Sequence, residues 1–255
     1  MNNKTSTSIL VIAVIVAVLS TAFGLSSMTT YAAPQSKASS ETTYKNGEQH
    51  DSNSHSPTFA ANEKVDHTKV TELRIALRDL WVDHVVWTRQ YIVAAAADAP
   101  DTDFAAQRLL KNQEDIGNAI KPFYGDEAGD KLTSLLKDHI LIAVDLLNAA
   151  KAGDSAGLAA AEGKWYDNAD DIATFLSDAN PNWPKDHLVK MLDQHLSLTK
   201  AEAVSRLTGN YTADIIAFDE IHRQSMTMAD ELADGIAKQF PEQFEVDRTA
   251  AARQN

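Results

Sequence analysis

Three histidines occupy the same place in three copies of one helical sequence pattern. His84, His139 and His195 lie 55 and then 56 residues apart along the chain. Each is accompanied by apolar residues at −7, −4, −3, +1 and +3, which is the spacing of one helix face. The pattern therefore predicts that each imidazole lies on the buried stripe of its helix. It also indicates an internal repeat of about 55 residues.

Buried imidazoles on neighbouring helices are suited to a metal site, because neutral imidazole is the most common metal ligand in proteins. A fourth histidine, His222, has apolar residues at −7 and −4. Met191 precedes His195 by four residues and Met226 follows His222 by four, so each pair shares a helix face. Histidine together with methionine favours copper, and imidazole also suits zinc. The candidate ligands of a transition metal are His84, His139, His195 and His222.

The same histidines could instead fix the packing of the helices. The segments between them carry a second repeated pair at a spacing of 56 residues, Asn112 with Asp115 and Asn168 with Asp171. A buried ring nitrogen needs a hydrogen-bond partner, and these four side chains are the candidate structural partners. Repeated helices also tend to place equivalent residues about 10 Å apart, which is too far for one metal ion. Repetition therefore favours packing over metal ligation, and both interpretations stay open.

Composition and motifs restrict the classes of function. The sequence contains no glycine-rich phosphate loop, no Gly-x-Ser-x-Gly element, no His-Glu-x-x-His motif and no cysteine. These absences argue against an enzyme without deciding the question. With 36 acidic and 23 basic residues the formal net charge is −13, which disfavours binding to nucleic acid and to anionic lipid surfaces.

The chain divides into four parts by composition. Residues 1–32 contain Lys4, an uncharged apolar run over 9–23 and the small-residue site Thr30-Tyr31-Ala32, which predicts a cleaved signal peptide or an N-terminal membrane anchor. Residues 33–65 form a predicted disordered polar linker, and residues 245–255 a flexible tail. The helical domain covers 66–244. This organisation predicts a protein outside the cytoplasm, either secreted or anchored to the outer face of the cytoplasmic membrane.

The domain is predicted to be all-α. Amphipathic periods interrupted by proline-containing or glycine-containing turns indicate six helices, near 64–97, 102–121, 130–151, 155–177, 184–207 and 211–239. Several turns end in Asp, Ser, Thr or Asn, which can cap the following helix. The expected architecture is three sequential helical hairpins that close into a six-helix bundle or form a short stack.

Three segments also carry a resemblance to a protein family. They are the run from Leu80 to Arg89, the run Asn112-Gln-Glu-Asp-Ile-Gly, and the run Ala229-Asp-Glu-Leu-Ala-Asp-Gly-Ile. They resemble an uncharacterised family of secreted or envelope-associated helical proteins of Gram-positive bacteria, and the resemblance covers most of 70–244. It implies an all-helical extracytoplasmic protein and brings no known site residues.

Two functions follow from these observations. The first is an extracytoplasmic binding or accessory protein that holds a metal ion or small ligand through the histidines of its core. The second is a structural or protein-interaction module of the cell envelope, in which the histidines serve packing. Contact with a membrane is expected only through the N-terminal segment, if that segment is not cleaved, and the sequence identifies neither a protein partner nor a small ligand.

Overall fold

The computed structural model describes residues 66–245, and these residues form α-helices joined by short turns. The elements are α2 (His67–Ala96), α3 (Thr102–Ala152), α4 (Ser155–Ala179), α5 (Lys185–Leu207), α6 (Tyr211–Gln239) and the 3-10 helix η1 (Pro241–Phe244). The predicted all-α class is confirmed. The predictions for 1–32, 33–65 and 246–255 lie outside the described residues.

The described residues contain five α-helices and not six separate ones, because the helices predicted at 102–121 and 130–151 are joined across a kink into α3. Only Gly125 leaves the helical conformation inside α3, with φ 83° and ψ 170°. This left-handed φ is one that glycine adopts without a steric penalty. The eight-residue turn expected between the two helices is therefore reduced to a single residue.

The two arms of α3 on either side of Gly125 fold back against each other. A Cβ atom on Gly117 would lie 1.9 Å from the Oγ1 atom of Thr133, so the two backbones are in close contact there. In a straight helix these residues would be about 24 Å apart. An ion pair of 2.5 Å between Lys137 and Glu114 also joins the arms. The arms form an antiparallel hairpin, with the first arm packed beside α2 and the second beside α4.

Polar side chains cap the N-termini of three of the helices. Asp66 accepts a hydrogen bond from the Thr68 amide at 2.9 Å, and Asp154 accepts one from the Gly157 amide at 3.0 Å. Asn210 caps α6 in the same way. Each contact satisfies one of the amide groups that a helix leaves unpaired at its N-terminus. The helix starts therefore agree closely with the sequence pattern.

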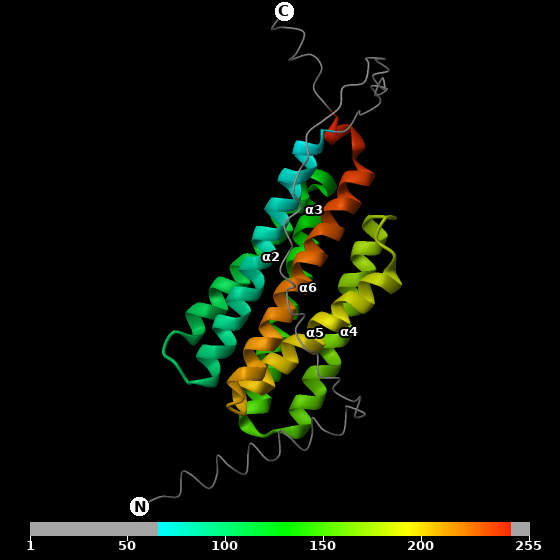
Figure 1. Ribbon diagram of the computed structural model, residues 1–255. Helices are drawn as coiled ribbons and strands as arrows, with labels where there is room; N and C mark the ends of the chain where they lie inside the picture. Colours follow the sequence, from blue (N-terminus) through cyan, green and yellow to red (C-terminus); the bar gives the residue numbers. More distant parts are fainter. Residues whose placement is uncertain (1–65, 246–255) are drawn as a thin grey trace, which may run out of the picture.

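The helices close into a bundle along one long axis (Figure 1). Neighbours in the chain pack on one another, and α6 returns to pack on α2, so the circuit of helices is complete. The amide of Asp66 donates to the carbonyl oxygen of Phe244 at 2.5 Å, which brings the start of α2 and the end of η1 together. Within 66–245, no helix is both long and apolar enough to cross a membrane.

The interior of the bundle contains two small cavities at different levels. One, of about 40 Å³, is lined by the three repeated histidines together with Thr88, Leu109 and Trp165 among others; we call it the histidine cavity. The other, of about 50 Å³, is lined by apolar residues that include Leu77, Leu188 and Trp183; we call it the apolar cavity.

Candidate functional site

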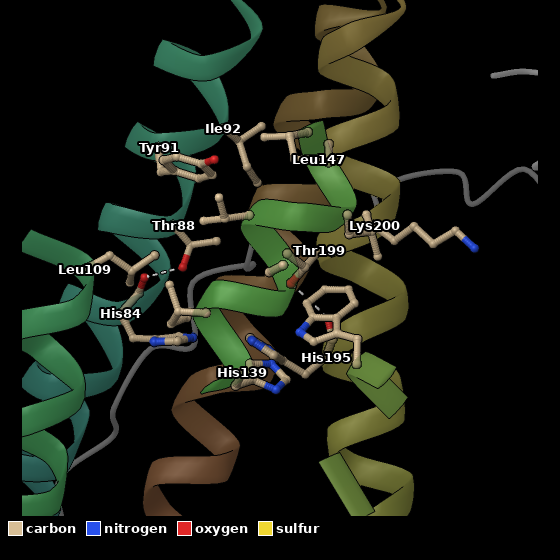
Figure 2. A pocket seen from close by; sticks show the side chains of 16 residues that line it. His84, Thr88, Tyr91, Ile92, Leu109, His139, Leu147, His195, Thr199 and Lys200 are labelled. Atoms are coloured by element: carbon tan, nitrogen blue, oxygen red, sulfur yellow. Dashed lines mark hydrogen bonds between the residues drawn. The ribbon is translucent and has the colours of Figure 1, made fainter. Parts of the chain in front are cut away.

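The histidine cavity collects one imidazole from each of three helices. His84 comes from α2, His139 from the second arm of α3 and His195 from α5, and their exposed fractions are only 5%, 6% and 4%. Figure 2 shows the three side chains grouped at one end of the cavity. The rings of His84 and His195 have centroids 5.7 Å apart. The expected spacing of about 10 Å between repeated residues is wrong for this pair, because the helices close around a common interior instead of lying in a row.

Each imidazole is held by a carboxamide side chain from the following helix of its hairpin. The Nδ1 atom of His139 lies 2.7 Å from Oδ1 of Asn168, and Nδ2 of Asn168 donates to the carbonyl oxygen of Leu135 at 3.1 Å. In the third hairpin Gln224 does the same: its Oε1 lies 3.2 Å from Nδ1 of His195, and its Nε2 donates to the carbonyl oxygen of Met191 at 3.0 Å. In both cases the backbone acceptor is four residues before the histidine.

The first hairpin repeats this arrangement with two adjacent amides. Asn112 donates through Nδ2 to the carbonyl oxygen of Leu80 at 3.0 Å, again four residues before the histidine, and its side chain hydrogen-bonds to His84. Gln113 lies beside it, with Nε2 donating to Oδ1 of Asn112 at 3.1 Å and approaching Nδ1 of His84 at 3.3 Å. All three histidines therefore have an amide on the Nδ1 side.

These amides determine which ring nitrogen carries the proton. Because the NH₂ group of Asn168 or Gln224 is committed to a backbone carbonyl, the amide oxygen faces the imidazole and can only accept. In His139 and His195 Nδ1 must therefore carry the hydrogen, which leaves Nε2 as the unprotonated nitrogen of the neutral ring. The group that faces Nδ1 of His84 is instead the NH₂ donor of Gln113, so the same argument does not fix the tautomer of His84. No other side chain or backbone group among the described residues is hydrogen-bonded to the Nε2 atoms of His84, His139 and His195.

Burial keeps the three rings neutral. Loss of hydration lowers the pKa of His84 to about 3, and the neighbouring His195 and His139 lower it further against the opposing effect of the amides. Burial likewise lowers the pKa of His139 to about 4 and lowers that of His195. A neutral imidazole with a free Nε2 is the form that binds metals.

Two tryptophans flank the histidines. The ring centroid of Trp81 lies 5.4 Å from that of His84, and the ring centroid of Trp165 lies 5.3 Å from that of His139. Trp165 is 3% exposed, and its indole Nε1 is buried without a hydrogen-bond partner among the described residues. The cavity therefore contains a donor that is not satisfied by the rest of the fold.

Charged groups near the cavity are engaged elsewhere. Lys200 lines the cavity, but its ammonium pairs with Glu162, and Figure 2 shows it extending away from the histidines. Glu202 is buried and binds Nη1 of Arg89 at 2.6 Å, and burial raises its pKa to about 7. Among the described residues, no aspartate or glutamate lines the histidine cavity.

The remaining candidate residues lie apart from the three imidazoles. His222 is on α6 and does not line the cavity; its ring packs 6.4 Å from that of Phe218, centroid to centroid. Asp115 forms an ion pair of 2.9 Å with Lys111, and Asp171 is exposed on α4. Of the proposed polar partners, Asn112 and Asn168 contact the histidines.

Sequence reasoning missed Gln224. It lies 56 residues after Asn168, just as Asn168 lies 56 after Asn112, so the spacing contained the signal. The change of residue type from Asn to Gln concealed it, although both side chains present the same amide group. Gln113, adjacent to Asn112, was also not expected to contact His84.

The imidazoles are close together but not in a coordinating arrangement. Over residues 66–245, no group of three or more His, Cys, Asp or Glu side chains is placed so that it could hold a metal ion. Comparison with known proteins adds no further constraint: no family model, no curated protein and no solved structure matches the chain. The resemblance to envelope-associated helical proteins stays a prediction.

Proposed function

We propose that this protein binds a transition metal ion in its core through the Nε2 atoms of His84, His139 and His195. The observation that carries the proposal is that three helices each direct one neutral, Nδ1-paired imidazole to a single cavity. A hydrogen bond at Nδ1 is the usual companion of a metal at Nε2, because it fixes the ring and increases its basicity. His222 is not part of this site.

The separation of two of the rings fits a shared ion. With metal–nitrogen distances of about 2.0–2.1 Å, two imidazoles on one ion have ring centroids about 5–6 Å apart. The centroids of His84 and His195 are 5.7 Å apart. Coordination by all three rings would require His139 to move toward this pair and away from its 2.7 Å contact with Asn168, because the three rings are not arranged to hold an ion in the structure. Imidazole ligands suit copper and zinc, which are the ions we expect.

The proposal extends to location and origin. We place the protein outside the cytoplasm, either secreted or anchored, on the basis of residues 1–32. We also propose that the three hairpins arose by duplication of a unit of about 55 residues. The 56-residue spacing of Asn112, Asn168 and Gln224 supports this, because each of the three amides bonds the carbonyl four residues before its histidine.

Metal titration of the purified full chain tests the proposal. Stability should rise on addition of the correct ion among Cu, Zn, Ni and Fe, by about 2.7 kcal/mol at a free metal concentration of 100 times Kd. For a domain of this size the melting temperature should increase by about 5–10 °C. Metal content by elemental analysis should reach one ion per chain.

Single substitutions identify the ligands. His84→Gln, His139→Gln and His195→Gln should each weaken metal affinity at least tenfold, because each removes a ligand. His222→Gln is the matched control and should leave affinity unchanged. Equal loss in all four variants, or no metal bound by the wild type, would contradict the proposal.

A packing role is the second candidate, and the Nδ1–amide pairs favour it. Such pairs satisfy buried polar groups without any ligand, and they would fix the register of each hairpin. In that case the three His→Gln variants should lose similar stability, and no metal should alter the melting temperature. The metal titration therefore separates the two candidates.

A further inference from the structure

The histidine cavity contains a hydrogen-bond donor that the described part of the chain does not satisfy. Trp165 lines the cavity and is 3% exposed, and its indole Nε1 has no partner among residues 66–245. A buried donor left unpaired is unfavourable by about 1–3 kcal/mol. In native structures such groups are paired with the protein or with ordered water. The indole alone does not identify its partner, so the other polar groups of the cavity must be considered with it.

Several other polar atoms of the cavity are hydrogen-bond acceptors. The contacts with amide oxygens place the ring hydrogen of His139 and His195 on Nδ1, so Nε2 of each ring can only accept. Thr88 and Thr199 each donate the hydroxyl hydrogen to the carbonyl oxygen four residues earlier, at 2.7 and 2.9 Å, which leaves their oxygens as acceptors. A molecule that satisfies the cavity must therefore accept from the indole and donate to these groups.

Size and charge restrict that molecule to a small neutral one. The cavity volume of about 40 Å³ exceeds the roughly 10–15 Å³ that one water requires. A simple anion could accept from the indole but could not donate to the imidazole nitrogens. It would also lose its hydration in a cavity whose lining is mostly apolar. Water is neutral, donates two hydrogen bonds and accepts two, and so matches the donor and the acceptors together.

The rings of Trp165 and His139 are close enough for one water to join them. Their centroids are 5.3 Å apart and their planes are inclined by 34°. Two nitrogen atoms that share a water at hydrogen-bond distance are themselves about 5 Å apart. We propose that at least one ordered water is bound in the histidine cavity, where it accepts from Nε1 of Trp165 and donates to Nε2 of His139. The inference does not rest on the proposed metal site, because it concerns the metal-free protein.

The apolar cavity provides an internal comparison. Its volume of about 50 Å³ is similar, but its lining consists of aliphatic, Met and Trp side chains. Trp183 lines it, and its Nε1 already donates to the carbonyl oxygen of Glu231 at 3.3 Å. Cavities without polar groups that need partners stay free of water. We therefore expect water in one cavity and none in the other, although the two are nearly equal in size.

Contacts between water and indole protons in NMR spectra of the full chain, treated with a chelator, test the inference. The indole proton of Trp165 should show NOE and ROE cross-peaks to water of opposite sign, which indicate a long-lived bound water. Proton exchange with the solvent would instead give the same sign in both spectra. The indole proton of Trp183 is the matched control and should show no such pair of cross-peaks. A Trp165 indole proton without them, or a Trp183 indole proton with equal ones, overturns the inference.

A crystal structure of the same metal-free protein locates the water. We expect it within about 2.7–3.2 Å of both Nε1 of Trp165 and Nε2 of His139, and no water in the apolar cavity. Trp165→Phe should lose this water, whereas Trp183→Phe should retain it. A histidine cavity without water, or a water that is unchanged in Trp165→Phe, contradicts the proposal. If Trp165→Phe does not fold, the wild-type crystal structure and NMR spectra decide the question.

Discussion

The histidine cavity and the apolar cavity are nearly equal in size, about 40 and about 50 Å³, but differ in chemistry. The apolar cavity is enclosed by aliphatic, Met and Trp side chains that include Leu77, Leu188 and Met228. The histidine cavity contains three imidazoles that must be dehydrated and paired with amides to be buried. The bundle can therefore close over a void of this size with apolar side chains alone.

The two cavities should differ most in how the residues that line them make the free energy of unfolding depend on pH. His84 and His139 have pKa values of about 3 and about 4 in the folded protein, below the value of about 6.5 in an unfolded chain. The unfolded chain therefore takes up protons first, and the stability due to neutral burial is lost as pH falls from 6.5 toward 3. For His84 alone the loss between pH 6.5 and pH 4 is about 3 kcal/mol. Urea unfolding followed by circular dichroism at pH 7, 6, 5 and 4 measures it.

Two controls define the source of this pH dependence. His84→Gln should reduce the slope below pH 6.5, whereas Leu188→Ala in the apolar cavity should lower stability without changing the slope. Glu202 acts in the opposite direction, because its raised pKa of about 7 makes the folded protein bind a proton more readily than the unfolded chain. If His84→Gln leaves the slope of stability against pH unchanged, His84 is not the cause of the pH dependence.

Substitutions that enlarge one cavity at a time show whether a change in stability is accompanied by a change in metal affinity. Leu109 lines the histidine cavity and Leu188 the apolar cavity, and both are 2% exposed. Replacing either by Ala should lower the free energy of unfolding by about 3 kcal/mol, because both create space that the fold fills incompletely. Only Leu109→Ala should change metal affinity in a calorimetric titration. If Leu188→Ala changed metal affinity as much as Leu109→Ala does, the metal site could not be assigned to the histidine cavity.

A smaller effect distinguishes the amides that support the histidines. Asn168→Leu leaves the buried Nδ1 of His139 without a partner and removes the hydrogen bond to the carbonyl oxygen of Leu135, which should lower stability by about 2 kcal/mol. Gln224 is only half-buried and water can replace its contacts, so Gln224→Leu should lower stability by about 1 kcal/mol. Thermal unfolding of the two variants gives the comparison. Equal losses would show that solvent does not reach Gln224.

Local features of the fold could be predicted from the sequence. The helix starts after Asp66 and Asp154 depend on a side chain and an amide a few residues away. The burial of His84, His139 and His195 depends on the apolar period of each helix. Both kinds of information lie within one or two turns of helix, so a single sequence contains them.

Features that depend on closure of the bundle could not be predicted in this way. One residue, Gly125, reverses the chain inside α3 and so determines where the second hairpin lies. The equivalent histidines lie close together because α6 packs on α2 and closes the bundle. The spacing of the histidines along the chain does not show whether the helices close in this way or form an open stack. Gln224 differs in residue type from Asn112 and Asn168 although it presents the same amide group, so a repeat defined by residue identity does not include it.

The hydrogen bond between Asp66 and Phe244 has a consequence for how the hairpins are connected. Because the residue before α2 and the last residue of η1 meet, the order of the hairpins around the bundle does not depend on where the polypeptide starts. A circular permutant that joins these ends and opens the chain in the turn at Gly153 or at Gly209 would keep every helix neighbour. The cyclic order of the helices, and not their linear order, is what encloses the three imidazoles.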